Sequence, residues 1–325
     1  MPSWLSLESS GKAGGMTQAI SCVASHGVSD VIFSPDGKRI AIMSSSFSDT
    51  LQLFDIESGA ALWKHRGAAV DIDVDFSADG ARLSVGGGAD KVSILDADDG
   101  RVMMRRRNPM GGPGTRLTAI SPDGTRLAAT YSSYVWVYDV ISRAEMQSFR
   151  RDEICQILRY SPDGTRIVTL AEGGIQVWDA ASGHLKSTLR APANTNSMEF
   201  GGCSHVLVTA GEDSIIRVWD IASGTKTRQL DPGPFIDHLI LGDGDGRVAL
   251  TVTGMLRVWD VMTGHERILM DTPQPLRFAA VNSDGTRLAT CNRRKSVEIW
   301  SIAATPALAT ADAASDRWCL RCRDR

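Results

Sequence analysis

The fold is decided by the stretch GEDSIIRVWDIASGTKTRQL, residues 211–230 of a 325-residue chain. Ile216 and Val218 suit a pleated, packed strand that ends at Asp220. Gly224 then gives the backbone the freedom that a tight reversal needs, and a second segment follows. The stretch therefore predicts strand, turn, strand. A single hairpin of this size is marginally stable in water, so its neighbours have to stabilise it.

Trp-Asp, or a close variant of it, recurs along the whole chain at a nearly constant spacing. Counted at the second residue of each pair, the successive spacings are 41, 43, 40, 41, 40 and 41 residues. The copies are Phe54-Asp55, Leu95-Asp96, Tyr138-Asp139, Trp178-Asp179, Trp219-Asp220, Trp259-Asp260 and Trp300-Ser301. A fixed period near 40 residues is typical of solenoids, propellers and arrays.

A second repeated pattern, Ser-Pro-Asp-Gly or a variant of it, precedes each of these pairs by about half a period and predicts a turn. Proline fixes φ at the first central turn position, aspartate can bond its own backbone, and glycine tolerates positive φ. The best copies begin at Ser34, Ser77, Ser121, Ser161 and Asn282, while the copies at 201–205 and 242–246 are eroded. A third pattern, Ser-Gly or Thr-Gly after the Trp-Asp pair, predicts a further turn at Ser58, Ser182, Ser223 and Thr263.

Each repeat thus predicts strand, turn, strand, loop, strand, turn, strand, and four strands per repeat indicate a propeller. No segment sustains apolar residues at a helical spacing, whereas turn signals fall every 8 to 12 residues. We therefore predict an all-β chain, a seven-bladed β-propeller of four-stranded antiparallel blades.

The strand count predicts how the ring closes. Seven sets of the first three strands are followed by six fourth strands, so one strand has to come from a terminus. We assign it to residues 16–23, since the rival segment, 302–309, contains Pro306. Closure by this N-terminal strand removes an exposed edge. The predicted divisions are a flexible N-terminus, the propeller, and an Ala-rich, disordered tail, at 1–14, 15–301 and 302–325.

The ordered series of Ser-Pro-Asp-Gly turns, Trp-Asp strand ends and Ser/Thr-Gly turns resembles the WD-repeat family over nearly the whole chain. The resemblance implies a seven-bladed propeller. In that family a repeat often carries a hydrogen-bonded set of His, Ser or Thr, Asp and Trp. Thr209, Asp213 and Trp219 match three of these positions, without a histidine at the fourth. The residues expected to be structural are completed by Asp220, Trp178, Trp259 and Trp300.

Composition favours a cytoplasmic protein, with the nucleus as a second location. The formal net charge of −3 gives no reason to expect nucleic acid or a membrane surface as partner. Most of the six cysteines stand far apart, which argues against a secreted disulfide framework. The N-terminus lacks the pattern of a signal peptide, and no apolar run is long enough for a membrane helix.

The sequence predicts no enzyme, no metal site and no cofactor. The repeated Asp-Gly pairs occupy one structural position, which turn chemistry explains better than paired catalytic carboxylates or calcium loops. No nucleophile elbow or phosphate-binding loop is present, and the histidines lack metal-ligand spacing. Cys319 and Cys322 form one Cys-x-x-Cys, but a structural zinc needs two further ligands.

Basic residues gather in the predicted loops that join the fourth strand of several repeats to the first strand of the next repeat. One hypothesis is that they form a basic rim that binds an acidic or phosphorylated partner protein. The alternative is a solvated rim, partly neutralised by Asp and Glu. The residues are Lys64, Arg66, Arg105, Arg106, Arg107, Arg150 and Arg151, with Arg293, Arg294 and Lys295 on the same face.

The resulting prediction is a non-catalytic scaffold that presents loop surfaces to partner proteins in a complex. A small-molecule ligand is not expected. The alternative is a propeller that serves as a gating or accessory domain of an enzyme, either peptidase-like or cofactor-holding.

Overall fold

The computed structural model describes residues 12–13, 16–23, 27–45, 50–66, 73–86, 91–109, 115–151, 153–201, 203–231, 236–241, 247–252, 255–260, 266–271, 276–282, 286–292 and 296–302. Within these ranges the chain forms the strands β1–β29 and no helix. Of the predicted terminal segments, residues 1–11 and 303–325 lie outside the described residues.

In the described part of the chain the strands form six four-stranded antiparallel sheets and one five-stranded sheet. The first three are β3 (Gly27–Phe33), β4 (Arg39–Ser45), β5 (Thr50–Asp55), β6 (Ala61–Arg66); β7 (Val74–Phe76), β8 (Arg82–Val85), β9 (Lys91–Asp96), β10 (Val102–Arg107); and β11 (Thr115–Ile120), β12 (Arg126–Tyr131), β13 (Tyr134–Asp139), β14 (Glu145–Arg150).

The next three sheets continue the same order along the chain. They are β15 (Ile157–Tyr160), β16 (Arg166–Ala171), β17 (Gly174–Asp179), β18 (Leu185–Leu189); β19 (Thr195–Phe200), β20 (Val206–Gly211), β21 (Ile216–Asp220), β22 (Thr225–Leu230); and β23 (Ile236–Leu241), β24 (Arg247–Val252), β25 (Met255–Asp260), β26 (Glu266–Asp271). In each, neighbouring strands in the sheet are consecutive in the sequence.

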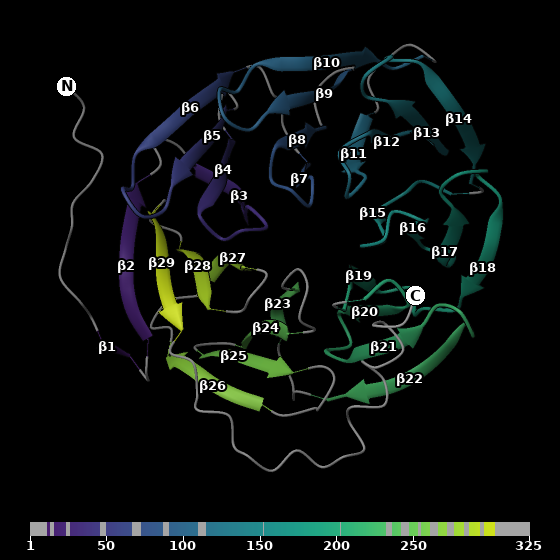
Figure 1. The fold of residues 1–325 in the computed structure, drawn as a ribbon. Helices are drawn as coiled ribbons and strands as arrows, with labels where there is room; N and C mark the ends of the chain where they lie inside the picture. Colours follow the sequence, from purple (N-terminus) through teal and green to yellow (C-terminus); the bar gives the residue numbers. More distant parts are fainter. Residues whose placement is uncertain are drawn as a thin grey trace, which may run out of the picture.

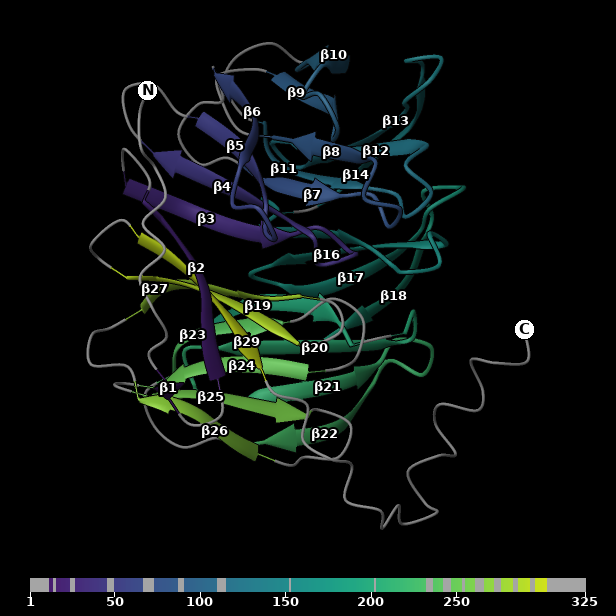
Figure 2. The same cartoon turned by 60° about the vertical axis from the view of Figure 1, so that its left-hand side comes forward.

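The sheets are arranged around a common axis, as Figure 1 shows, so the fold is an all-β propeller. In the six four-stranded sheets the first strand lies innermost and the last lies at the periphery, whereas in the five-stranded sheet β27 lies innermost and β2 lies toward the periphery; Figure 2 shows the sheets from the side. Inner strands of consecutive sheets are neighbours from β7 through β11, β15, β19 and β23 to β27, and β27 also lies beside β3. The predicted four-stranded antiparallel architecture is thereby confirmed.

The five-stranded sheet combines the two ends of the described chain. It has the order β1-β2-β29-β28-β27, with β1 (Lys12–Ala13), β2 (Met16–Val23), β27 (Leu276–Val281), β28 (Arg287–Asn292) and β29 (Ser296–Ile302). The strand predicted over 16–23 is present as β2 and pairs antiparallel with β29 from Met16↔Ile302 to Val23↔Ser296. The two residues of β1 extend this sheet from within the N-terminal segment that we predicted to be flexible.

The predicted Ser-x-Asp-Gly turns join the first and second strands of four sheets. In the turn between β3 and β4, Ser34 Oγ donates to Asp36 Oδ1 at 2.6 Å and accepts a hydrogen bond from Arg39 N at 2.9 Å. Gly37 has φ of +65°, which a residue with a side chain rarely adopts. The turns at Ser77, Ser121 and Ser161 repeat the Ser-to-Asp bond.

The apolar core lies between the sheets, where their faces pack together. One buried cluster contains Val28 and Ile40 of the first sheet with Ala289 and Ile299 of the five-stranded sheet. Further buried clusters join the second sheet to the first, the third to the second, the fourth to the third, and the fifth to the fourth. Packing between neighbours therefore stabilises the sheets that these clusters join, as expected for repeats that cannot bury their faces alone.

Candidate functional site

Four of the predicted basic residues are exposed on the peripheral strands of three consecutive sheets. Lys64 lies on β6, Arg105 and Arg107 lie on β10, and Arg150 ends β14. We call these four residues the basic edge. The sequence analysis had placed them in loops, but pairing with the third strand continues further, and Arg107 still pairs with Lys91. They therefore stand on fixed backbone near the strand ends.

The first two sheets bring their basic residues close together at this edge. Burial lowers the pKa of His65 on β6, and the positive charge of Arg105 on β10 lowers it further. Arg105 Nε also donates a hydrogen bond to Ser93 Oγ at 3.4 Å. Arg106 is half-buried, with its guanidinium carbon 5.6 Å from the centre of the Tyr138 ring. We therefore assign Arg106 to packing between sheets and leave it out of the basic edge.

The remaining predicted basic residues are not assigned to the basic edge, because they are either outside the described part of the chain or buried. The Arg66 side chain and residues 293–295, which include Arg293, Arg294 and Lys295, lie outside the described part. Arg151 is only 3% exposed, because it turns inward between β14 and β15.

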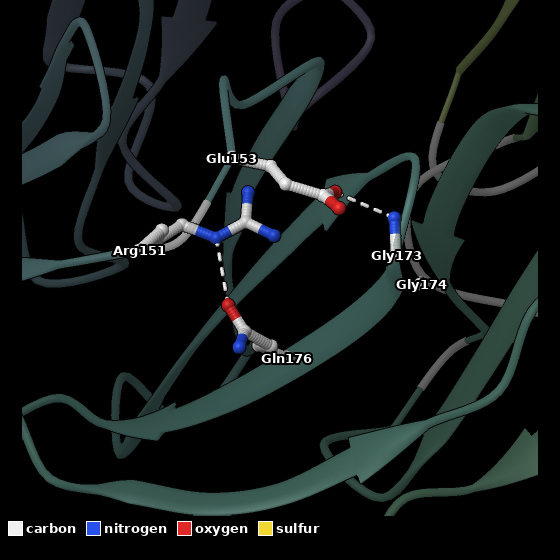
Figure 3. Close-up of a pocket in the computed structure, with 5 residues that line it drawn as sticks. All are labelled: Arg151, Glu153, Gly173, Gly174 and Gln176. Atoms are coloured by element: carbon white, nitrogen blue, oxygen red, sulfur yellow. Dashed lines mark hydrogen bonds between the residues drawn. The ribbon is translucent and has the colours of Figure 1, made fainter.

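Arg151 lies in a small pocket of about 120 Å³ in the fourth sheet, shown in Figure 3. Its Nε donates to Gln176 Oε1 at 2.8 Å, and its Nη1 donates to Leu170 O at 3.3 Å. On the opposite wall, Glu153 Oε2 accepts a hydrogen bond from Gly173 N at 2.5 Å. Arg151 and Glu153 therefore fasten the link between β14 and β15 to the second and third strands of that sheet.

Charged side chains of the inner strands meet near the propeller axis. Arg159 Nε lies 2.7 Å from Glu199 Oε2, and Asp73 Oδ2 accepts a hydrogen bond from Thr118 N at 2.6 Å. Burial alone would lower the pKa of Arg159, but Glu199, Asp73 and Asp75 raise it. Desolvation raises the pKa of Asp73 to about 6, although Arg159 and Thr118 act in the opposite direction. We call Asp30, Asp73, Asp75, Arg159 and Glu199 the axial cluster.

The tryptophans predicted to be structural form a repeated hydrogen bond inside the sheets. Trp219 Nε1 donates to Thr209 Oγ1 at 2.9 Å, as the sequence pattern predicted. Trp178 donates in the same way to Thr169, and Trp300 donates to Thr290, each at 2.9 Å. Trp259 lies on β25, but its side chain lies outside the described residues.

The two predicted structural aspartates of the fifth sheet have other partners. Asp213 bonds the Arg217 guanidinium rather than the Trp219–Thr209 pair. Asp220 Oδ1 accepts hydrogen bonds from Ala222 N at 2.8 Å and Ser223 N at 2.9 Å, and thereby shapes the turn before β22.

An arginine that follows the turn serine by five residues was not among the predicted site residues. Its guanidinium donates a hydrogen bond to a backbone carbonyl of a neighbouring sheet. Arg39 Nη2 donates to Gly80 O at 2.8 Å, and Arg82 donates to Gly124 O. Arg287 Nη1 donates to Gly37 O at 2.9 Å, from the five-stranded sheet back to the first. The constant spacing was visible as Arg39, Arg82, Arg126, Arg166, Arg247 and Arg287, with Val206 as the exception.

The described residues contain neither a metal site nor a membrane-spanning helix. In that part of the chain no three His, Cys, Asp or Glu side chains come together as metal ligands would. No helix there has the length and hydropathy that crossing a membrane requires.

The comparison with protein families decides the nature of the repeat. The model described as "WD domain, G-beta repeat" matches residues 17–55 and 183–220. The chain contains WD40 repeats. Both matches cover a peripheral strand and the first three strands of the following sheet, so the WD40 repeat is offset from the sheet by one strand.

Curated relatives and a solved structure are similar to parts of this WD40-repeat chain. The target of rapamycin complex subunit wat1 of Schizosaccharomyces pombe is 24% identical over 56% of this chain and 62% of its own length. The COMPASS component SWD3 of Saccharomyces cerevisiae is 27% identical over 45% of this chain and 48% of its own. The WD repeat-containing protein SL1-17 of Schistosoma mansoni is 25% identical over 39% and 44%. The matches thus span less than two thirds of these relatives.

Among solved structures, the β-propeller domain of Cps50 (Swd1) from Myceliophteria thermophila superposes with a TM-score of 0.73. It covers 89% of this chain and 100% of that one at 16% identity, which shows a shared fold.

Proposed function

We propose that this WD40-repeat chain is a non-catalytic scaffold subunit that binds an acidic or phosphorylated partner protein through its basic edge. The observation that carries the proposal is the exposure of Lys64, Arg105, Arg107 and Arg150 on paired strands of three consecutive sheets. Because the backbone of these residues is already paired in strands, binding does not have to order it, and the cations complement carboxylate or phosphate groups.

The scaffold we propose is a ring of seven blades, with the five-stranded sheet as the seventh and β2 as its closing strand. Three observations support closure. β2 pairs with β29 along its length, and buried side chains of the first and last sheets share one cluster. Arg287 also donates a hydrogen bond to Gly37 of the first sheet. In a closed ring the first and last sheets pack against each other, and the closing strand covers the edge of β29. The ring then supports its loops and edges rigidly.

The names of two relatives support a role inside a protein complex. Wat1 is named as a subunit of the target of rapamycin complex, and SWD3 is named as a component of COMPASS. These names describe those proteins, and they agree with a propeller that works by holding partners together.

Charge reversal tests the basic edge. Because Arg106 packs against Tyr138, the variant should change only exposed residues, as Arg105→Glu with Arg107→Glu. Partners captured by the full chain would be identified by mass spectrometry, and their affinities measured at two salt concentrations. We expect affinity to fall by about tenfold or more, and the wild-type affinity to weaken as salt rises.

The matched control reverses two exposed cations on another peripheral strand, Lys226→Glu with Arg228→Glu on β22. It makes the same change in net charge. The basic edge is excluded as the binding surface if both variants weaken partner binding equally or if neither does.

A further inference from the structure

The turn between β19 and β20, residues 201–206, departs from the other turns of its kind. In the preceding sheet, Ser161 Oγ donates to Asp163 Oδ1 at 2.6 Å and accepts from Arg166 N at 2.9 Å. The equivalent positions of the 201–206 turn hold Gly201, Cys203 and Val206. The serine, the aspartate and the arginine are thus replaced together.

Packing around Gly201 leaves little room for a side chain at the serine position of this turn. A Cβ atom on Gly201 would lie 3.0 Å from Val206 Cγ1 and 3.1 Å from Val208 Cγ2, closer than side chains normally approach. Val206 and Val208 therefore crowd the position of a side chain at residue 201. Because residue 201 is a glycine, Cys203 at the aspartate position has no serine hydroxyl as a hydrogen-bond partner.

The residue at the aspartate position faces an imidazole. Cys203 Sγ lies 3.7 Å from His205 Nε2, within hydrogen-bonding reach for sulfur, and both residues are half-buried. Ile221 N donates to His205 O at 2.9 Å, and Val206 N donates to Cys203 O at 3.3 Å. These backbone bonds hold the two residues in one turn.

The same turn makes contact with the fourth sheet through Ser204. Its Oγ accepts a hydrogen bond from Asp163 N at 2.9 Å, and its carbonyl accepts from Arg166 Nη1 at 3.4 Å. Asp163 and Arg166 therefore bring charged groups from the neighbouring sheet to this turn. Arg166 Nη1 lies 4.0 Å from Asp163 Oδ2. Ser204 stands between Cys203 and His205 in the sequence. A group attached to Cys203 would therefore lie next to the contact between the fourth and fifth sheets.

A thiol beside an imidazole is chemically different from a thiol in an apolar core. The thiolate is the nucleophile, and an adjacent imidazole favours it by accepting the proton. Cys155 gives the contrast within this chain, because burial raises its pKa to about 11 and its Sγ donates to Ile157 O at 3.0 Å.

We propose that Cys203 and His205 form a reactive thiol site that exchanges with low-molecular-weight disulfides, an inference independent of the proposed function. His205 Nε2 accepts the thiol proton, and Cys203 Sγ attacks one sulfur of the disulfide. A bond forms between Cys203 and that sulfur as the original sulfur–sulfur bond breaks. The leaving thiolate takes the proton back from His205, so one disulfide and one thiol are consumed and one of each is formed.

The test measures alkylation of each cysteine in the native full-length chain by iodoacetamide, followed by peptide mass spectrometry between pH 6 and 9. If the pKa of a thiol falls by one unit, its thiolate fraction at neutral pH rises about tenfold. The thiolate also becomes less nucleophilic, which lowers its rate constant about threefold. We therefore expect Cys203 to react about threefold faster than it does in the unfolded chain at pH 7. His205→Gln should abolish this advantage, while Cys155 should stay protected in both proteins.

Exposure to glutathione disulfide should then add one glutathione to wild-type Cys203, more slowly in His205→Gln and not in Cys203→Ser. The pH profile of the wild type alone remains decisive if His205→Gln does not fold: its midpoint should lie below about 8.5, the ordinary thiol value. The proposal is overturned if native Cys203 reacts no faster than in the unfolded chain, or if the folded variant keeps the wild-type rate.

Discussion

At the scale of single residues, the axial cluster combines charges that a strand-by-strand reading cannot bring together. Asp73 lies just before β7, three residues before Phe76, as Asp30 lies three residues before Phe33, whereas Arg159 and Glu199 stand on β15 and β19, far away in sequence. Only the arrangement of inner strands around one axis brings them close. The sequence therefore predicts the turns, and the WD-repeat resemblance implies the Thr209–Trp219 pair within one sheet, but neither predicts this cluster.

Asp73→Asn should raise stability at neutral pH and change little in acid. The pKa of Asp73 is about 6 in the folded protein against 3.8 for an ordinary aspartate, so the folded state binds the extra proton between these values. Stability therefore falls as pH rises from about 4 to 6. The amide oxygen can still accept from Thr118 N. Calorimetric melting temperatures at pH 4 and pH 7.5 would measure the difference.

Asp123→Asn is the control with the opposite sign. Burial opposes ionisation of Asp123, but hydrogen bonds from Ser121 and Thr125 outweigh it and lower its pKa. That variant should lose stability at pH 7.5 and approach the wild type as pH falls through the folded pKa. Equal effects of Asp73→Asn at both pH values would contradict the assigned pKa.

At the scale of strands, the repeat predicts element positions closely because its signals mark strand ends. Of the seven strands expected to end at Trp-Asp or its variants, six end at Asp55, Asp96, Asp139, Asp179, Asp220 and Asp260, and the seventh, β29, ends at Ile302, one residue beyond Ser301. The peripheral strands were harder to predict, because no motif marks where they end. This is why the basic residues at 105–107 were predicted in a loop although their backbone pairs with β9.

Removal of β2 should destabilise the molecule and make it self-associate. A chain lacking residues 1–23 loses the partner of β29 and exposes that strand's edge, which can then pair with another molecule. We expect the melting temperature to fall by at least about 5 °C. Light scattering after size-exclusion chromatography should show oligomers. The shorter deletion of residues 1–11 keeps β1 and β2 and should behave as the wild type.

At the scale of the whole molecule, stability is shared among the seams between sheets. Buried clusters join neighbouring sheets, and an arginine that follows the turn serine adds a polar bond across several seams. In a closed ring the seam between the last and first sheets is equivalent to the others. In an open ring that seam would contribute nothing, although the remaining seams would be unchanged.

Arg287→Ala and Arg82→Ala together distinguish the two cases. Arg82 donates to Gly124 O between the second and third sheets, and Arg287 donates to Gly37 O between the last and the first. A bond from a partly exposed charged donor contributes about 1 kcal/mol. Loss of that bond should lower the melting temperature by about 2 °C in a chain of this size. Closure predicts similar losses for both variants by calorimetry, and an effect of Arg82→Ala alone would show that the ring is open in solution.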